Sequence, residues 1–153
     1  MEADVIFENH APELRKAMLK MLDGALEECG IEAERNAKII YCPVDTGRLK
    51  NSITHAVGGQ PAAISTYRGD RKGKKGKGDT KPPGVYSGTA PKDDDEERSV
   101  WVGTNVEYGR AIELGTSKIT ARPYIRPSIE NHLSKYEEIF DDWVKQIEES
   151  FGS

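Results

Sequence analysis

The chain has 153 residues, enough for one well-buried domain and too few for two, so we expect a single domain over residues 1–153. Its net charge of −4 means that the whole molecule is not attracted to nucleic acid or to anionic membranes. No apolar run approaches the roughly 20 residues of a membrane span, and the N-terminus lacks a signal-peptide pattern. The two cysteines form no disulfide framework, and Cys29 falls on a predicted helix stripe. A protein made in a reducing cytoplasm is expected.

The first predicted element is a long amphipathic helix that ends before Pro43. Its apolar residues, spaced by three, four and seven, are Leu14, Met18, Met21, Leu22, Ala25, Cys29, Ala33 and Ala37. Charged residues, among them Glu27 and Glu34, are expected on the opposite face. Asn9 is the predicted N-cap. Gly30 is expected to mark a bend or a break, because glycine costs about 1 kcal/mol in a helix interior.

A short helix is predicted directly after this element. Asp45 or Thr46 is its expected N-cap, and Leu49 and Ile53 lie one turn apart on it. The triplet Asp45–Gly47 also matches that of aspartic proteases, in which two aspartates share a proton. It is followed here by an arginine instead of a small residue, and its surroundings are helical. We therefore interpret the triplet as a cap and a turn glycine, without a catalytic role.

Residues 58–98 are predicted to be a long mobile loop. A glycine-rich stretch is strongly basic and contains Arg68, Arg71, Lys72, Lys74, Lys75, Lys77 and Lys81. The acidic run Asp93–Glu97 follows it, so opposite charges are expected to draw the loop into a loose hairpin. Such a composition buries too little apolar surface to offset the entropy of ordering. The basic residues, flanked by Tyr67 and Tyr86, are candidates for contact with a nucleic acid or an acidic partner.

Strands are predicted on both sides of this loop. Thr54–Val57 and Ser99–Thr104 are expected to form a small antiparallel sheet, because the second segment is β-branched and aromatic. Ile119–Ile125 is expected to be extended or an edge strand.

Two further helices complete the predicted fold. A short one within Val106–Thr116 is closed by Gly115, and its expected buried residues are Tyr108, Ile112 and Leu114. A long one opens at Pro127, with the apolar stripe Ile129, Leu133, Tyr136, Phe140, Trp143 and Ile147. The predicted fold class is α+β: a small antiparallel sheet packed against two long amphipathic helices, with a long disordered loop insertion.

Residue patterns that carry chemistry are missing from the sequence. The three histidines, His10, His55 and His132, are not at ligand spacing from one another or from a cysteine. No serine lies in a nucleophile elbow, and the Gly-Lys pairs of the loop lack phosphate-loop spacing. We expect no catalytic residue, no metal, no cofactor and no enzymatic activity.

Three segments, in order, resemble the motifs of a family of small tail-completion and head–tail joining proteins of long-tailed bacteriophages. Cys42–Ile53 resembles its "pvDTGrLrnSI" signature, Val102–Thr116 its "vGtnveYa-yvE-GT" block, and Arg122–Ile129 its "aRPFlrPAl" block. The chain departs from the pattern at Gly109, where the family usually has alanine, and at Tyr124, where phenylalanine is common.

This resemblance implies a structural virion protein that is made in the host cytoplasm and forms a homo-oligomeric ring at the head–tail junction. The implied partners are its own copies, a head-completion or connector protein, and the tail terminator or tail tube. It implies no cofactor. It implies structural roles for Asp45, Thr46, Gly47, Leu49, Ile53, Tyr108, Glu113, Gly115, Thr116, Pro123 and Pro127. The alternative is a nucleic-acid-binding accessory protein that uses the basic loop 68–81.

Overall fold

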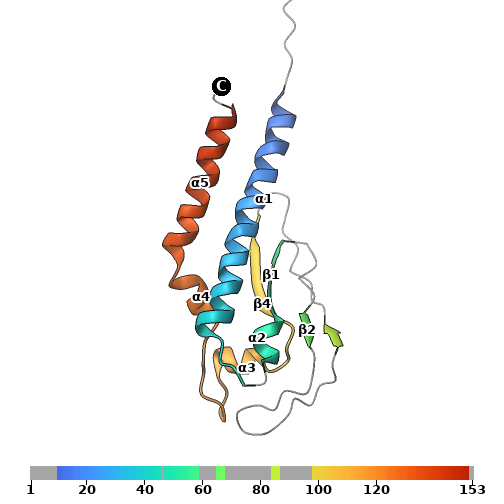
Figure 1. Cartoon of the computed structure of the whole chain (residues 1–153), viewed down its shortest axis with the longest axis vertical. Helices are drawn as coiled ribbons and strands as arrows, with labels where there is room; N and C mark the ends of the chain where they lie inside the picture. Colours follow the sequence, from blue (N-terminus) through green and yellow to red (C-terminus); the bar gives the residue numbers. More distant parts are fainter. Residues whose placement is uncertain (1–9, 46, 59–64, 68–83, 87–97, 152–153) are drawn as a thin grey trace, which may run out of the picture.

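The computed structural model describes residues 10–45, 47–58, 65–67, 84–86 and 98–151. In chain order its elements are α1 (Ala11–Asn36), the π-helical turn η1 (Ala37–Tyr41), α2 (Arg48–Ser52), β1 (Ile53–Val57), β2 (Ser65–Tyr67), β3 (Gly84–Tyr86), β4 (Val100–Thr104), α3 (Gly109–Leu114), α4 (Arg126–Glu130) and α5 (Leu133–Phe151). The long helices α1 and α5 lie side by side and run in opposite directions, and α2 and α3 gather at one end (Figure 1). The predicted α+β class is confirmed.

Helix α1 is packed on two faces instead of one. Small residues of the predicted stripe, Ala25, Cys29 and Ala33, are buried. The charged face was predicted to lie opposite this packing, but part of it contacts the sheet. Glu27 and Glu34 both hydrogen-bond the ring of His55 on β1, at 3.0 and 2.5 Å. The N-cap position is occupied by His10 and not by Asn9, which lies outside the described residues.

Gly30 is a packing residue, and the predicted break at this position is wrong. Helix α1 continues through it without interruption. A Cβ at this position would lie 2.6 Å from Cδ2 of His55 and 2.8 Å from Cγ2 of Val100. The lack of a side chain therefore lets the sheet approach the helix closely.

Helix α1 ends as predicted before Pro43, through a single π-helical turn. The Cys42 N–H donates to the carbonyl of Ala37 over 2.8 Å, which closes this turn. Cys42 is then extended, as expected for a residue that precedes proline.

The sheet against α1 has two antiparallel strands, β1 and β4, with Ile53 opposite Thr104 and Val57 opposite Val100. A second antiparallel pair, β2 and β3, lies within the segment that was predicted to be an unstructured loop. That prediction missed these strands. The remaining residues of 58–98 are outside the described part of the chain, except Gly58 and Arg98.

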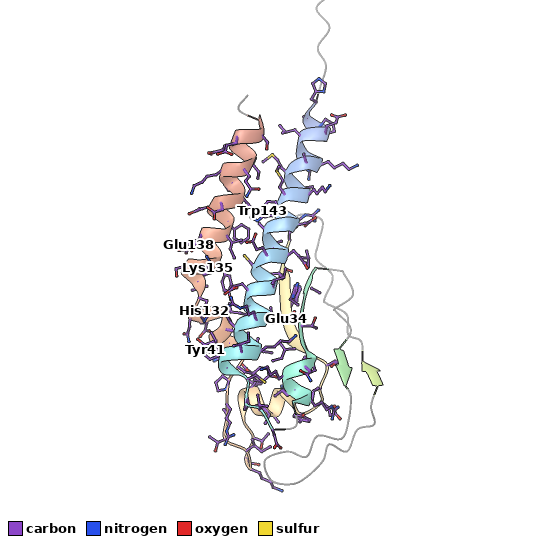
Figure 2. The ribbon with its side chains drawn as sticks, viewed as in Figure 1. Glu34, Tyr41, His132, Lys135, Glu138 and Trp143 are labelled. Carbon is purple, nitrogen blue, oxygen red and sulfur yellow. The ribbon has the colours of Figure 1, made fainter. Side chains whose placement is uncertain are left out.

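The last predicted helix is two helices, α4 and α5. Pro127 lies in the first turn of α4, as predicted. The helix is interrupted at Asn131 and His132, whose side chains both hydrogen-bond the hydroxyl of Tyr41, at 3.1 and 3.2 Å. Tyr41 and His132 lie next to each other in Figure 2. Because of this break, Leu133 is 56% exposed, although the stripe predicted it to be buried.

Candidate functional site

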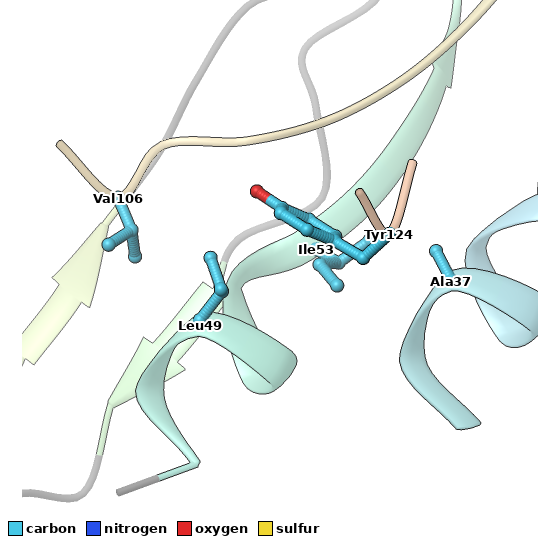
Figure 3. Close-up of a cluster of buried hydrophobic side chains, with 5 residues drawn as sticks. All are labelled: Ala37, Leu49, Ile53, Val106 and Tyr124. Atoms are coloured by element: carbon cyan, nitrogen blue, oxygen red, sulfur yellow. The ribbon is translucent and has the colours of Figure 1, made fainter. Parts of the chain in front are cut away.

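The three motif segments meet at one end of the molecule around a shared apolar cluster. Leu49 and Ile53 come from the first motif, Val106 from the second and Tyr124 from the third, and Ala37 closes the cluster from the end of the first helix (Figure 3). Each is at most 7% exposed. We call this region the motif junction.

Arg48 joins the first motif to the second. Its side chain is 4% exposed, and its Nη2 donates to Oε2 of Glu107 over 2.8 Å. Its guanidinium carbon lies 5.5 Å from the ring centroid of Tyr108. Tyr108 and Leu114 were predicted to be buried, but they are 36% and 54% exposed. Tyr108 occupies the N-cap position of α3, and its partly exposed ring packs against the buried guanidinium of Arg48.

A chain of hydroxyl groups forms a second link between these motifs. The Val106 N–H donates to Oγ1 of Thr104 over 3.1 Å, and Thr104 shares a 2.5 Å hydrogen bond with Ser52. Ser52 is 3% exposed and donates to the carbonyl of Leu49 over 2.7 Å. Every hydroxyl in this buried chain is therefore satisfied, as burial of polar groups requires.

Glu113 joins the second motif to the third. Its Oε2 accepts the backbone N–H groups of Tyr124 and Ile125, at 2.7 and 3.0 Å. Its Oε1 accepts the N–H of Arg126 at 3.0 Å. One carboxylate thus fixes three successive peptide groups, and charge-assisted bonds of this kind are stronger than neutral ones.

The turn after α3 depends on Gly115 and Thr116. Gly115 has φ of 76°, and a Cβ there would lie 2.9 Å from the backbone nitrogen of Ala121. It ends α3, as predicted. The Thr116 Oγ1 accepts the N–H groups of Lys118 and Ile119, at 3.2 and 3.1 Å. This turn directs the chain back toward Glu113.

The two departures from the family pattern contact each other. Tyr124 is fully buried, and its hydroxyl donates to the carbonyl of Gly109 over 3.2 Å. A Cβ on Gly109 would lie 2.9 Å from that hydroxyl and 2.5 Å from Cγ2 of Thr104. Burial raises the pKa of Tyr124, so the phenol stays a neutral donor. A glycine at 109 therefore makes room for the hydroxyl that a phenylalanine at 124 would lack.

Over residues 7–115 the sequence matches a family model described as "Bacteriophage HK97-gp10, putative tail-component". The chain belongs to this HK97-gp10-like family. Comparisons with curated proteins and with solved structures returned no match. The first motif lies inside the matched range, the second lies inside it except for its last residue, Thr116, and the third follows it.

The remaining predicted residues of this HK97-gp10-like chain are placed as follows. Gly47 has φ of 87° and occupies the N-cap position of α2, so the prediction of a cap at Asp45 or Thr46 was placed too early. Asp45 is exposed, and Thr46 lies outside the described residues. Pro123 is exposed next to Tyr124. The basic residues of 68–81 also lie outside the described part of the chain.

Sequence reasoning missed the polar residues that tie the motifs of this HK97-gp10-like chain together. Arg48, Ser52 and Glu107 were read only as members of motif segments. The sequence marks these residues only by placing each of them inside a motif. The hydrogen-bonded partners are 52 and 59 residues apart in sequence. No local pattern encodes such pairings.

The polar groups of the junction are engaged in contacts within the described part of the chain. The groups described above bind backbone amides, each other and aromatic rings. Among the described residues, no group of three or more histidine, cysteine, aspartate or glutamate side chains is arranged to hold a metal ion. None of the described helices is both long and apolar enough to cross a membrane.

Proposed function

We propose that this protein works at the head–tail joint of a bacteriophage, where a ring of its copies completes the tail and joins it to the head. The family makes the chain a structural component of a phage tail, and thus a part of the virion. The observation that carries the proposal is the convergence of three joining-protein motifs into one junction. Its partners in this role are its own copies, a head-completion or connector protein, and the tail terminator or tail tube.

Apolar surface supports the proposal of self-association. Several large apolar side chains of α1, η1 and α5 are more than a third exposed: Leu14, Met18, Leu22, Ile39, Ile40, Leu133 and Val144. Four of them, Leu14, Met18, Leu22 and Val144, line one open pocket, and contiguous apolar surface is typical of protein–protein contacts. The motif junction supports a role without catalysis, because its polar groups bind one another.

A phage that lacks this gene tests the joining role. Heads should still fill with DNA and tails should still polymerise, because joining follows both steps. Electron microscopy of the lysate should show separate heads and tails and few complete particles. Empty heads, or no heads, would count against the joining role and point to a step in packaging or capsid assembly.

Contact with DNA is a second proposal, and it concerns the basic residues of 68–81. Seven lysine and arginine side chains with interleaved glycines resemble a segment that follows a phosphate backbone. DNA binding by the purified protein should then weaken steeply with salt, and deletion of 68–81 should remove it. Binding that persists in the deletion variant would exclude this segment as the contact.

A further inference from the structure

An apolar groove lies between the first half of α1 and the second half of α5. A cavity of about 480 Å³ is lined almost entirely by apolar side chains, among them Met18, Leu22, Phe140, Val144 and Ile147. Met18 and Val144 are both 48% exposed, so the groove is open. Leaving these apolar side chains in water does not stabilise the single chain, whereas covering them would be favourable.

The floor of the groove is held rigidly by Trp143, which points from α5 toward α1 (Figure 2). Its indole Nε1 donates to Oε2 of Glu28 over 2.8 Å. A Cβ on Gly24 would lie 2.5 Å from Cη2 of the indole, so the glycine allows the ring to touch the helix backbone. The groove is therefore a preformed surface.

Opposite charges flank the groove on its two helices. Arg15 lines the rim on α1. Glu148 on α5 does not line the groove, but it is exposed and lies one helical turn beyond Val144, which does. A copy turned by 180° about an axis parallel to the helices places its α5 against α1 and its α1 against α5. The start of α1 and the end of α5 lie at the same end of the helical pair (Figure 1). Because Arg15 is near the start of α1 and Glu148 near the end of α5, Arg15 of each copy is then near the level of Glu148 of the other.

We propose that in the free protein this groove is covered by the same groove of a second copy, as a two-fold pair in which Arg15 of each copy faces Glu148 of the other. This pair goes beyond the joining role, since it concerns the protein before it enters a virion. Charge complementarity favours a second copy as the occupant, because one chain supplies both charges. Such an interface is isologous, so each contact occurs twice.

The test is the mass of the purified full chain by light scattering and sedimentation over a range of concentrations. The wild type should have twice the monomer mass. Met18→Glu, which puts a charge in the apolar centre, should give a monomer with an unchanged circular dichroism spectrum. Arg15→Glu should weaken the pair about tenfold, because two ion pairs become repulsive. Lys16→Glu is the matched control, since the same charge change on the far side of α1 should have no effect.

Mixing two weakened variants makes the test specific. Glu148→Arg alone should weaken the pair as Arg15→Glu does, with Glu149→Arg as its control. An equimolar mixture of Arg15→Glu and Glu148→Arg should restore the pair, because both contacts are again between opposite charges. A monomeric wild type, or a mixture that stays as weak as its components, would overturn the proposal. The joining role stands or falls separately, on the deletion phage.

Discussion

Glu113 holds three backbone N–H groups with one carboxylate, so the third motif depends on this side chain. Glu113→Ala should lower the free energy of unfolding by about 2–3 kcal/mol, because partly buried donors lose their acceptor. Glu113→Gln should cost less, since it retains one oxygen. Urea denaturation measures both, and Glu130→Ala on the exposed side of α4 should stay within about 0.5 kcal/mol of the wild type. Equal effects of Glu113→Ala and Glu130→Ala would contradict this role.

Gly109 and Tyr124 should be energetically coupled. Gly109→Ala should destabilise the fold by about 1–3 kcal/mol, because its methyl group would press on the Tyr124 hydroxyl and on Thr104. Tyr124→Phe should cost about 1 kcal/mol through the lost hydrogen bond.

The double variant restores the pair that resembles the family pattern. It should cost at least about 0.5 kcal/mol less than the sum of the single changes, since the alanine at 109 no longer meets a hydroxyl. A double-mutant cycle by urea denaturation measures this coupling. Strict additivity would show that Thr104 alone opposes the methyl group.

At the scale of elements, the contact between α1 and β1 depends on protonation. His55 lies between Glu34 and Glu27, and its hydrogen bond to Glu34 raises the pKa of the imidazole. Burial alone would raise the pKa of Glu34, but hydrogen bonds from His55 and Lys38 lower it to about 2. The histidine's contribution to stability is therefore complete below its ordinary pKa of 6.5 and is lost as pH rises through the raised value.

The carboxylate limits stability on the acid side. The contribution of Glu34 is present above its ordinary pKa of 4.5 and is lost as pH falls toward 2. The contribution of this contact to the free energy of unfolding should thus be greatest between pH 4.5 and 6.5. His55→Gln should remove the decline above pH 6.5, whereas His10→Gln at the exposed start of α1 should not. An unchanged decline in His55→Gln would assign it to other groups.

The elements that could be predicted from the sequence are those whose bounds are set by residues within or next to the element itself. Pro43, Pro127 and Gly115 ended or opened elements as predicted, because each acts through its own backbone geometry. Gly30 was misinterpreted, because its role is to leave space for His55, which lies 25 residues later on β1. The break between α4 and α5 was missed for the same kind of reason, since it is bound by Tyr41, the last residue of η1.

The molecule as a whole has two regions that differ in the polarity of their contacts. The motif junction contains many polar links between segments that are distant in sequence, and the three motifs predict its location but not its pairings. The helical hairpin of α1 and α5 is apolar and partly open. Its stripes predicted two long amphipathic helices, but spacing alone does not say which neighbour covers a stripe. Leu14, Met18 and Leu22 belong to the predicted stripe, but in the single chain they remain exposed.

Trp143→Ala separates the stability of the whole molecule from the integrity of the junction. The change removes an indole that is packed against Gly24 and bonded to Glu28, far along the chain from any motif. Because the ring is only partly buried, the loss should be about 2–3 kcal/mol, below the full cost of a buried aromatic. That loss lowers the midpoint of thermal unfolding by about 10 °C in a domain of this size.

A phage carrying Trp143→Ala should therefore plate normally at low temperature and fail at high temperature, where its lysates should contain unjoined heads and tails. The proposed joining role predicts this phenotype, because unfolding of the protein leaves the joint incomplete while the earlier assembly steps proceed. Trp101→Ala is the control, because that ring on β4 is 45% exposed and its loss should move the unfolding midpoint little. If Trp143→Ala unfolds at the lower temperature and the phage still joins its heads and tails there, the folded chain is not needed at the joint.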